Sequence, residues 1–170
     1  MTDTLLIYYS LTGLNDTIAT QVKAMTNADV FKITSKYDYP TGMSQCWNVV
    51  RKLRNIKTAI PRHGEPLPDI SKLPSIETTP AISKYQNIII GGPVWGWTMS
   101  DPVMTYLSMN DLSDKNVKAY WTCVDTDYNY EHDLQTLLTS STNYQGGLCI
   151  NASLLDNPQR LQRALKQLLG

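Results

Sequence analysis

Short apolar runs alternate along this chain with stretches whose apolar residues recur at helical spacing. The runs, which are typical of strands buried in a parallel sheet, lie at 5–9, 29–34, 87–90, 117–124 and 148–150. The helical stretches lie at about 14–25, 43–58, 101–107, 131–140 and 161–168. Five strands with intervening helices predict an α/β fold with a doubly wound, five-stranded parallel sheet.

The chain has 170 residues, which suits one domain with a sizeable core, so we treat residues 1–170 as a single domain. Its one irregular stretch is 61–84, which holds five of the nine prolines. So long a connection is unusual inside a compact domain. It is either functional or a packed surface excursion.

Charge argues against several classes of partner. Lys plus Arg and Asp plus Glu both number 15, and the pI is near 6.7, which indicates neither a nucleic-acid-binding protein nor an acidic docking surface. A basic run without acids contains Arg51, Lys52, Arg54, Lys57, Arg62 and His63. This run is either a solvated helix face or a docking patch for an acidic partner or a pyridine-nucleotide phosphate. The N-terminus has no basic n-region and its apolar run is too short for a membrane span, so we expect a soluble, cytoplasmic protein.

Metal and hydrolytic chemistry find no support in the sequence. Cys46, Cys123 and Cys149 lie far apart without metal-ligand spacing, which fits reduced thiols in the cytosol. His63 and His132 have no partners at the spacing of a metal site or a catalytic triad. The dinucleotide, Walker, nucleophile-elbow and zinc-protease motifs are all absent from the sequence.

The turn between the first expected strand and the first expected helix predicts a phosphate site. It consists of Ser10, Leu11, Thr12, Gly13, Leu14 and Asn15. N–H groups at a helix N-terminus are unpaired and lie at the positive end of the helix dipole, where anions bind. Gly13 lets the backbone approach an anion, and the side chains of Ser10, Thr12 and Asn15 can each add a hydrogen bond. The same residue types also suit a simple N-cap, and that alternative stays open.

Two further loops are expected beside this turn. In an open parallel sheet, ligands bind beyond the carboxyl ends of the strands where the strand order reverses. For the order 2-1-3-4-5 that point lies between the first and third strands. The third strand enters Pro93, Val94, Trp95, Gly96 and Trp97, whose two indole rings suit the walls of a flat aromatic ligand site. Alternatively, one tryptophan, Trp97 more than Trp95, fills a pocket under the loop.

The loop after the fourth strand, residues 122–130, is expected to close the other side of this crevice. Its candidate binding residues are Thr122, Cys123, Val124, Asp125 and Tyr128. Tyr128 or Tyr130 would cover an exposed ring face, or both would only face solvent. Cys123 either approaches the ligand or is an inert core thiol. Exposed loop carboxylates are usually only solvated, so no catalytic acid or base is assigned.

Together and in this order, these segments resemble the flavodoxin family. The resemblance rests on the turn 10–13, the run Ile-Ile-Ile-Gly-Gly-Pro-Val-Trp at 88–95 with Pro102 downstream, and the segment 118–122. It covers nearly the whole chain and is similar to bacterial flavodoxin-like proteins with a Gly-x-Pro-x-Trp loop. It implies noncovalently bound FMN, with its phosphate at 10–15 and its isoalloxazine between the loops 93–98 and 122–130. A carbonyl near Trp95–Gly96 would accept a hydrogen bond from N5–H of the reduced ring.

Three features depart from the family pattern. Asn15 stands where Thr or Ser is usual, although an amide can still donate. The segment 124–126 stands where Gly and Ser are usual and where backbone amides reach the pyrimidine edge of the flavin. The chain is also neutral, whereas electron-shuttling flavodoxins are strongly acidic.

These observations predict an FMN-binding flavoprotein, active in electron transfer or as a small FMN-dependent reductase. The neutral charge favours the reductase, or a carrier with a different partner, over a low-potential shuttle. Expected partners are a redox protein or a small-molecule electron acceptor, with NAD(P)H as a candidate donor and neither nucleic acid nor membrane. The alternative is a flavodoxin-like binding module with weak or no flavin affinity.

Overall fold

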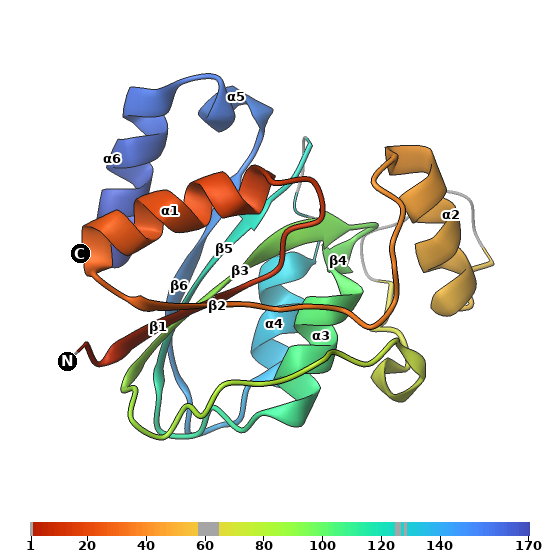
Figure 1. The fold of residues 1–170 in the computed structure, drawn as a ribbon, viewed down its shortest axis with the longest axis horizontal. Coiled ribbons are helices and arrows are strands. Elements are labelled where there is room, and N and C mark those ends of the chain that lie inside the picture. The colour runs from red at the N-terminus through yellow and green to blue at the C-terminus, as the bar shows by residue number, and fades with distance from the viewer. Residues whose placement is uncertain (1, 58–64, 125–126, 128) are drawn as a thin grey trace.

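The computed structural model describes residues 2–57, 65–124, 127 and 129–170. A twisted parallel sheet runs through its centre (Figure 1). Its parallel strands are β1 (Thr4–Tyr8), β2 (Asp29–Lys32), β3 (Asn87–Trp95), β5 (Asn116–Thr122) and β6 (Asn143–Ile150). They lie in the order β2-β1-β3-β5-β6. The α/β fold and the predicted order of the five parallel strands are therefore confirmed.

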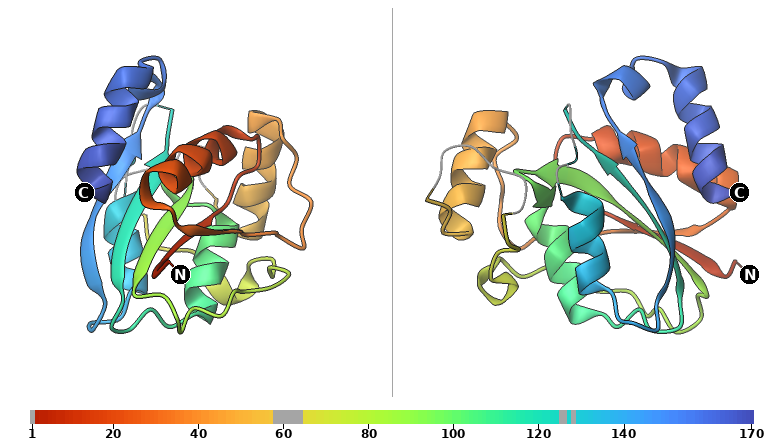
Figure 2. Two further views of the ribbon diagram at one scale, coloured as in Figure 1. Left: turned by 60° about the vertical axis from the view of Figure 1, so that its left-hand side comes forward. Right: turned by 180° about the vertical axis from the view of Figure 1, so that it is seen from behind.

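Helices cover both faces of the sheet (Figure 2). On one face lie α1 (Leu14–Thr26), the short α5 (Ala152–Leu155) and α6 (Pro158–Leu169). On the other lie α3 (Asp101–Met109) and α4 (Tyr130–Leu137). No helix in the described part of the chain is both long and apolar enough to cross a membrane.

The alternation of side chains along β1 explains the two layers. Successive strand residues point to opposite faces. Leu6 accordingly packs with α1 and α6, while Leu5 and Ile7 pack with α3 and α4. All three side chains are almost completely buried. A continuous apolar run is what a strand covered on both faces requires.

The helix α2 (Met43–Leu53) lies beyond the carboxyl ends of the strands, at the right of Figure 1, instead of over a face of the sheet. Its residues Cys46 and Val50 pack with Tyr39 in a small cluster of their own. The helix ends near Leu53, short of the predicted residue 58, and Asn55 adopts a left-handed conformation with φ 54° just after it. Left-handed residues are common where helices end.

The described part of the proline-rich segment, 65–84, packs against the core. It contains a short 3₁₀ helix, η1 (Ile70–Lys72), and buries Leu73 and Ile76 in the cluster that includes α3. The hydroxyl of Thr105 in α3 donates to the carbonyl of Pro74 at 3.2 Å. Of the two alternatives left open by the sequence, this part is a packed surface excursion.

Two strands are longer than the sequence pattern predicts. β3 continues through Gly91–Pro93, which pair parallel with β5, to Trp95, where its end pairs antiparallel with β4 (Thr98–Met99). The expected loop 93–98 is therefore a β-hairpin. β6 begins at Asn143 instead of 148, and its first residues alternate in exposure, as suits an edge strand without an apolar run.

Candidate functional site

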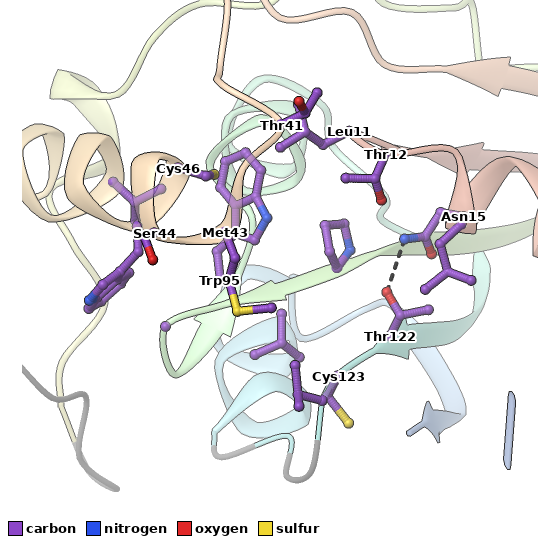
Figure 3. Close-up of a pocket in the computed structure, with 17 residues that line it drawn as sticks. Leu11, Thr12, Asn15, Thr41, Met43, Ser44, Cys46, Trp95, Thr122 and Cys123 are labelled. Atoms are coloured by element: carbon purple, nitrogen blue, oxygen red, sulfur yellow. Dashed lines mark hydrogen bonds between the residues drawn. The ribbon is translucent and has the colours of Figure 1, made fainter. Parts of the chain in front are cut away.

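A cavity of about 580 Å³ opens at the carboxyl ends of the strands (Figure 3). This volume lies in the range of about 300–1,000 Å³ that is usual for small-molecule and cofactor sites. Four segments form its walls: the turn that leads into α1, the helix α2 with the residues just before it, the β3–β4 hairpin and the end of β5. The described residues that line it are Leu11, Thr12, Leu14, Asn15, Thr41, Met43, Ser44, Cys46, Trp47, Val50, Pro93, Val94, Trp95, Gly96, Thr122, Cys123 and Val124. None of these lining residues is charged.

The polar end of the cavity lies at the N-terminus of α1. Gly13 occupies the N-cap position with φ 92°, and no side chain caps the helix there. The first N–H groups of a helix lack intrahelical acceptors. The buried Oγ of Ser10 has no hydrogen-bond partner among the described residues. Because a sterically open backbone, unpaired N–H groups and an unpartnered hydroxyl meet at this helix end, the turn fits an anion such as a phosphate.

Asn15 links this turn to the end of β5. Its Nδ2 donates to Oγ1 of Thr122 at 3.0 Å, and Figure 3 shows this bond across the polar end of the cavity. The Oδ1 of Asn15 is buried without a partner in the described part of the chain. If the amide turned over, Thr122 could donate to Oδ1 and Nδ2 would become free to donate to a ligand. The amide therefore suits this position despite replacing the usual hydroxyl.

Asp16 brings a negative charge into the first turn of α1. The hydroxyl of Tyr8 donates to its Oδ1 at 2.7 Å, and Nζ of Lys32 lies 2.7 Å from the same atom. Burial alone would raise the pKa of Asp16, but the bonds from Lys32 and Tyr8 lower it below the usual value. Lys32 pairs with the Asp16 carboxylate. The negative charge of Asp16 therefore repels a nearby anion less than an unpaired carboxylate would.

Trp95 stands at the apolar end of the cavity, and neighbouring rings fix its position. Tyr9 meets it edge to face with the ring centroids 5.6 Å apart, and Tyr39 packs against it at 4.8 Å. Gly96 follows with φ 72°, and a Cβ there would lie only 2.8 Å from the ring of Trp47. The turn of the hairpin thus packs closely on α2, which only a glycine permits.

A buried ion pair anchors the same hairpin to α2. Nε of Arg54 donates to Oδ1 of Asp101 at 2.6 Å, and its two Nη atoms donate to the carbonyls of Trp95 and Met99, each at 2.8 Å. The hydroxyl of Tyr39 donates to Oδ2 of Asp101 at 2.9 Å. Arg54 itself is therefore neither part of a solvated helix face nor free to dock a partner, whereas Arg62 and His63 of the basic run lie outside the described residues.

The structure brings most of the predicted binding residues around one cavity. Those of the turn, the hairpin and the β5 end are Leu11, Thr12, Leu14, Asn15, Pro93, Val94, Trp95, Gly96, Thr122, Cys123 and Val124. Ser10 and Gly13 belong to the same turn, although they do not line the cavity. Asp125 and Tyr128 lie outside the described residues.

Trp97 and Tyr130 point elsewhere. Trp97 is only 3% exposed, does not line the cavity, and its ring lies 5.6 Å from the guanidinium of Arg54. This placement favours the alternative that Trp97 fills space under the hairpin. Tyr130 is fully buried and stacks on Trp121 at 4.7 Å, so it does not cover a ligand. Both rings serve packing because their faces are already occupied.

The sequence did not identify the wall that α2 contributes. This wall consists of Thr41, Met43, Ser44, Cys46, Trp47 and Val50. The apolar stripe of the helix was recognisable, but the stripe does not reveal which part of the molecule it faces. The available signal was Trp47, a large ring on a helix followed by an unusually long connection. The described residues contain no group of three His, Cys, Asp or Glu side chains that could hold a metal ion.

Comparisons with known proteins agree with this geometry. A family model described as flavodoxin matches residues 3–162. A crystal structure from Bacteroides uniformis ATCC 8492 superposes with a TM-score of 0.74 at 20% identity, covering 97% of this chain and 98% of that one. A flavoprotein from Lactobacillus acidophilus NCFM in complex with FMN has a TM-score of 0.65 at 18% identity, covering 92% and 97%. At these identities the structures show a shared fold. No curated protein matches the chain.

Proposed function

This chain belongs to the flavodoxin family, and we propose that it binds FMN noncovalently in the cavity and acts as an oxidation–reduction protein. The observation that carries the proposal is the division of this one cavity into two ends. A polar end lies at the N-terminus of α1, and an apolar end is bounded by Trp95 and Trp47. FMN has the same division, with an anionic phosphate at one end and a planar ring system at the other.

At the polar end, the N-terminus of α1 would hold the phosphate. The N–H groups of Leu14 and Asn15 belong to the first turn and have no intrahelical acceptor. The hydroxyls of Ser10 and Thr12 and the amide of Asn15 add side-chain donors. No Lys or Arg among the described residues lines the cavity, so the helix dipole and these hydrogen bonds would meet the phosphate charge.

At the apolar end, Trp95 would contact the ring system. Tyr9 and Tyr39 already hold the Trp95 side chain in place. Ligand binding therefore costs little conformational entropy of this side chain. Trp47 and Val50 of α2 line the cavity as well. Val124 also lines the cavity and is 69% exposed.

When bound, FMN supplies reversible one- and two-electron transfer. The protein contributes the surroundings of the ring, and these are uncharged among the described lining residues. Since the carbonyl of Trp95 already accepts from Arg54, the neighbouring carbonyl of Gly96 is the better candidate acceptor for a ring N–H. The buried Arg54–Asp101 pair keeps this part of the hairpin in place.

The balanced charge of the chain bears on its partners. A strongly acidic carrier is steered to basic partners by its field, and a chain with 15 acidic and 15 basic residues lacks such a field. This favours a small reductase with a small-molecule acceptor over a low-potential shuttle.

Rapid mixing of the flavin-loaded protein with NADPH separates the two roles. Fast bleaching of the flavin without an added reductase supports the reductase, and no bleaching supports a carrier.

The binding proposal is tested by titrating the flavin-free protein with FMN and, in parallel, with riboflavin, which lacks the phosphate. Binding is followed by quenching of flavin fluorescence. We expect FMN to bind at least about tenfold more tightly, which corresponds to about 1.4 kcal/mol from the phosphate site. Equal affinity for the two flavins would show that the N-terminus of α1 does not bind the phosphate. No binding of either would support the alternative, a binding module without flavin affinity.

A further inference from the structure

Two cysteine side chains meet where β5 and β6 end. Cys123 directly follows β5, and Cys149 lies near the end of β6, 26 positions later. Their Sγ atoms are 2.8 Å apart. Both residues are only partly buried, so a small molecule in solution can reach the pair. Cys46 lies apart from them, buried in the cluster around α2.

The sheet fixes this arrangement. Trp121 lies opposite Cys149 in the register of β5 and β6, and the N–H of Cys123 donates to the carbonyl of Ile150 at 3.1 Å. Side chains two residues apart on a strand share a face, so Cys123 follows Trp121 to the face on which Cys149 lies. A disulfide bond is about 2.05 Å long, so the two sulfurs need to approach by less than about 1 Å to form one.

We propose that Cys123 and Cys149 are a redox-active pair that cycles between two thiols and an intramolecular disulfide by exchange with a disulfide substrate. The thiolate of one cysteine attacks a sulfur of the substrate, forms a mixed disulfide and releases one substrate thiolate. The second cysteine, also as a thiolate, attacks the protein sulfur of that mixed disulfide and releases the other substrate thiolate. The substrate gains two electrons and the two protons that the cysteines lose, and it leaves as two thiols.

The surroundings of Cys149 indicate the order of attack. Burial is the largest influence and raises the pKa of the Cys149 thiol; the hydrogen bond with Cys123 lowers it and the negative charge of Asp127 raises it, so that the net shift is upward. A thiol with a raised pKa is less often ionised at neutral pH. Cys123 also lines the cavity, which opens to solvent, whereas Cys149 does not, so Cys123 is the thiol that attacks the substrate and Cys149 resolves the mixed disulfide from 2.8 Å away.

The pair is separable from the cavity. Cys123 belongs to the cavity wall, but Figure 3 shows its sulfur directed away from Asn15 and Thr122 at the polar end. The exchange uses only thiols and a disulfide and requires no flavin. A failure of FMN to bind would thus leave this inference standing, and a failure of the cysteine pair would leave the FMN proposal standing.

The test counts thiols in the full-length protein with glutathione as the probe. The protein is equilibrated with mixtures of reduced and oxidised glutathione, and is then denatured and treated with N-ethylmaleimide. Mass spectrometry measures the mass of the product and hence the number of alkylated thiols. All three cysteines should be alkylated in reduced glutathione and only Cys46 in oxidised glutathione. The transition should have the same midpoint from either direction. No Lys or Arg lies between the pair, so cleavage after Glu131 is needed to show the cross-linked peptides.

Single substitutions separate the roles of the cysteines. Cys149→Ser should retain one glutathione on Cys123, because no thiol remains to resolve the mixed disulfide. Cys123→Ser should retain much less. Cys46→Ser is the matched control and should behave like the unaltered chain, apart from one fewer thiol. The three variants are compared by circular dichroism to verify their folds.

Three results would overturn the proposal or its details. If the unaltered chain keeps three alkylatable thiols across the whole glutathione range, the pair is not redox-active. A disulfide that involves Cys46 would contradict the assignment of the pair. Glutathione on Cys149 in the Cys123→Ser variant, exceeding that on Cys123 in Cys149→Ser, would reverse the proposed order of attack.

Discussion

Nε of Arg54 lies 2.6 Å from Oδ1 of Asp101, and neither side chain is exposed to solvent. This pair joins the end of α2 to the start of α3, and its remaining donors hold the carbonyls of Trp95 and Met99. Two walls of the cavity therefore depend on one guanidinium. Removal of one partner from a buried pair leaves an uncompensated charge, which costs about 3–5 kcal/mol.

Arg54→Met should accordingly lower the free energy of unfolding by about 3–5 kcal/mol. The double substitution Arg54→Met with Asp101→Leu should be less destabilised than the single one, because it leaves no buried charge unpaired. Lys52→Met, at an exposed position of the same helix, is the control and should change stability by less than about 0.5 kcal/mol. Urea denaturation measures all three. An Arg54→Met variant as stable as the unaltered chain would show that the pair does not anchor the hairpin.

Gly13→Val should weaken FMN binding at least tenfold while the protein still folds. The φ of 92° disfavours a branched side chain, which also hinders the approach of a phosphate to the backbone. Gly146→Val is a matched control, since Gly146 has φ 107°, no atom within 4 Å of its Cβ position and no part in the cavity wall. Fluorescence titration should show normal FMN affinity for this control. Equal losses of FMN affinity in both variants would show that backbone strain alone causes the effect.

Trp95→Ala should weaken FMN binding about fivefold, because a good aromatic contact contributes about 1 kcal/mol. The same substitution should shift the midpoint potential of the bound flavin, whereas Trp95→Phe, which keeps a ring at this position, should restore most of the affinity. Titration and spectroelectrochemistry give the two quantities. Unchanged affinity together with an unchanged potential would mean that the indole does not touch the flavin.

Asp16→Asn should reduce stability at neutral pH but not in strong acid. Lys32 and Tyr8 hold the folded-state pKa of Asp16 below its usual 3.8. The stabilisation by the carboxylate is thus present above pH 3.8 and is lost as the pH falls through the lower, folded-state value. Because the pair is partly exposed, its loss should cost less than about 1 kcal/mol at pH 7. Urea denaturation between pH 2 and 7 checks this. A difference between the two proteins that grows toward acid pH would contradict it.

Local pattern was sufficient to predict the sheet and the position of the turn 10–15 before α1. The run 5–9 is apolar at every position because both faces of β1 are covered, and Leu14, Ile18 and Val22 repeat at helical spacing in α1. Once the strand order was assumed, the turn 10–15 and the end of β5 had to lie at the same edge. The hydrogen bond between Asn15 and Thr122 is a direct consequence.

Features that depend on contacts between distant segments were not recognisable. An apolar stripe shows that α2 is buried on one side, but it does not show that Trp47 faces a cavity. A basic run gives no indication that Arg54 meets Asp101 across 47 positions. In the same way, the spacing of Cys123 and Cys149 suggested isolated thiols, while the register of β5 and β6 places them side by side.

One cavity should hold the phosphate of FMN at the start of α1 and the ring system of FMN beside Trp95. A crystal structure of the complex with FMN would show this arrangement. We expect a phosphate within hydrogen-bond distance of the N–H groups of Leu14 and Asn15, with the isoalloxazine against the indole of Trp95. A flavin bound elsewhere, or crystals in excess FMN in which the hairpin and the turn have closed onto each other, would contradict it.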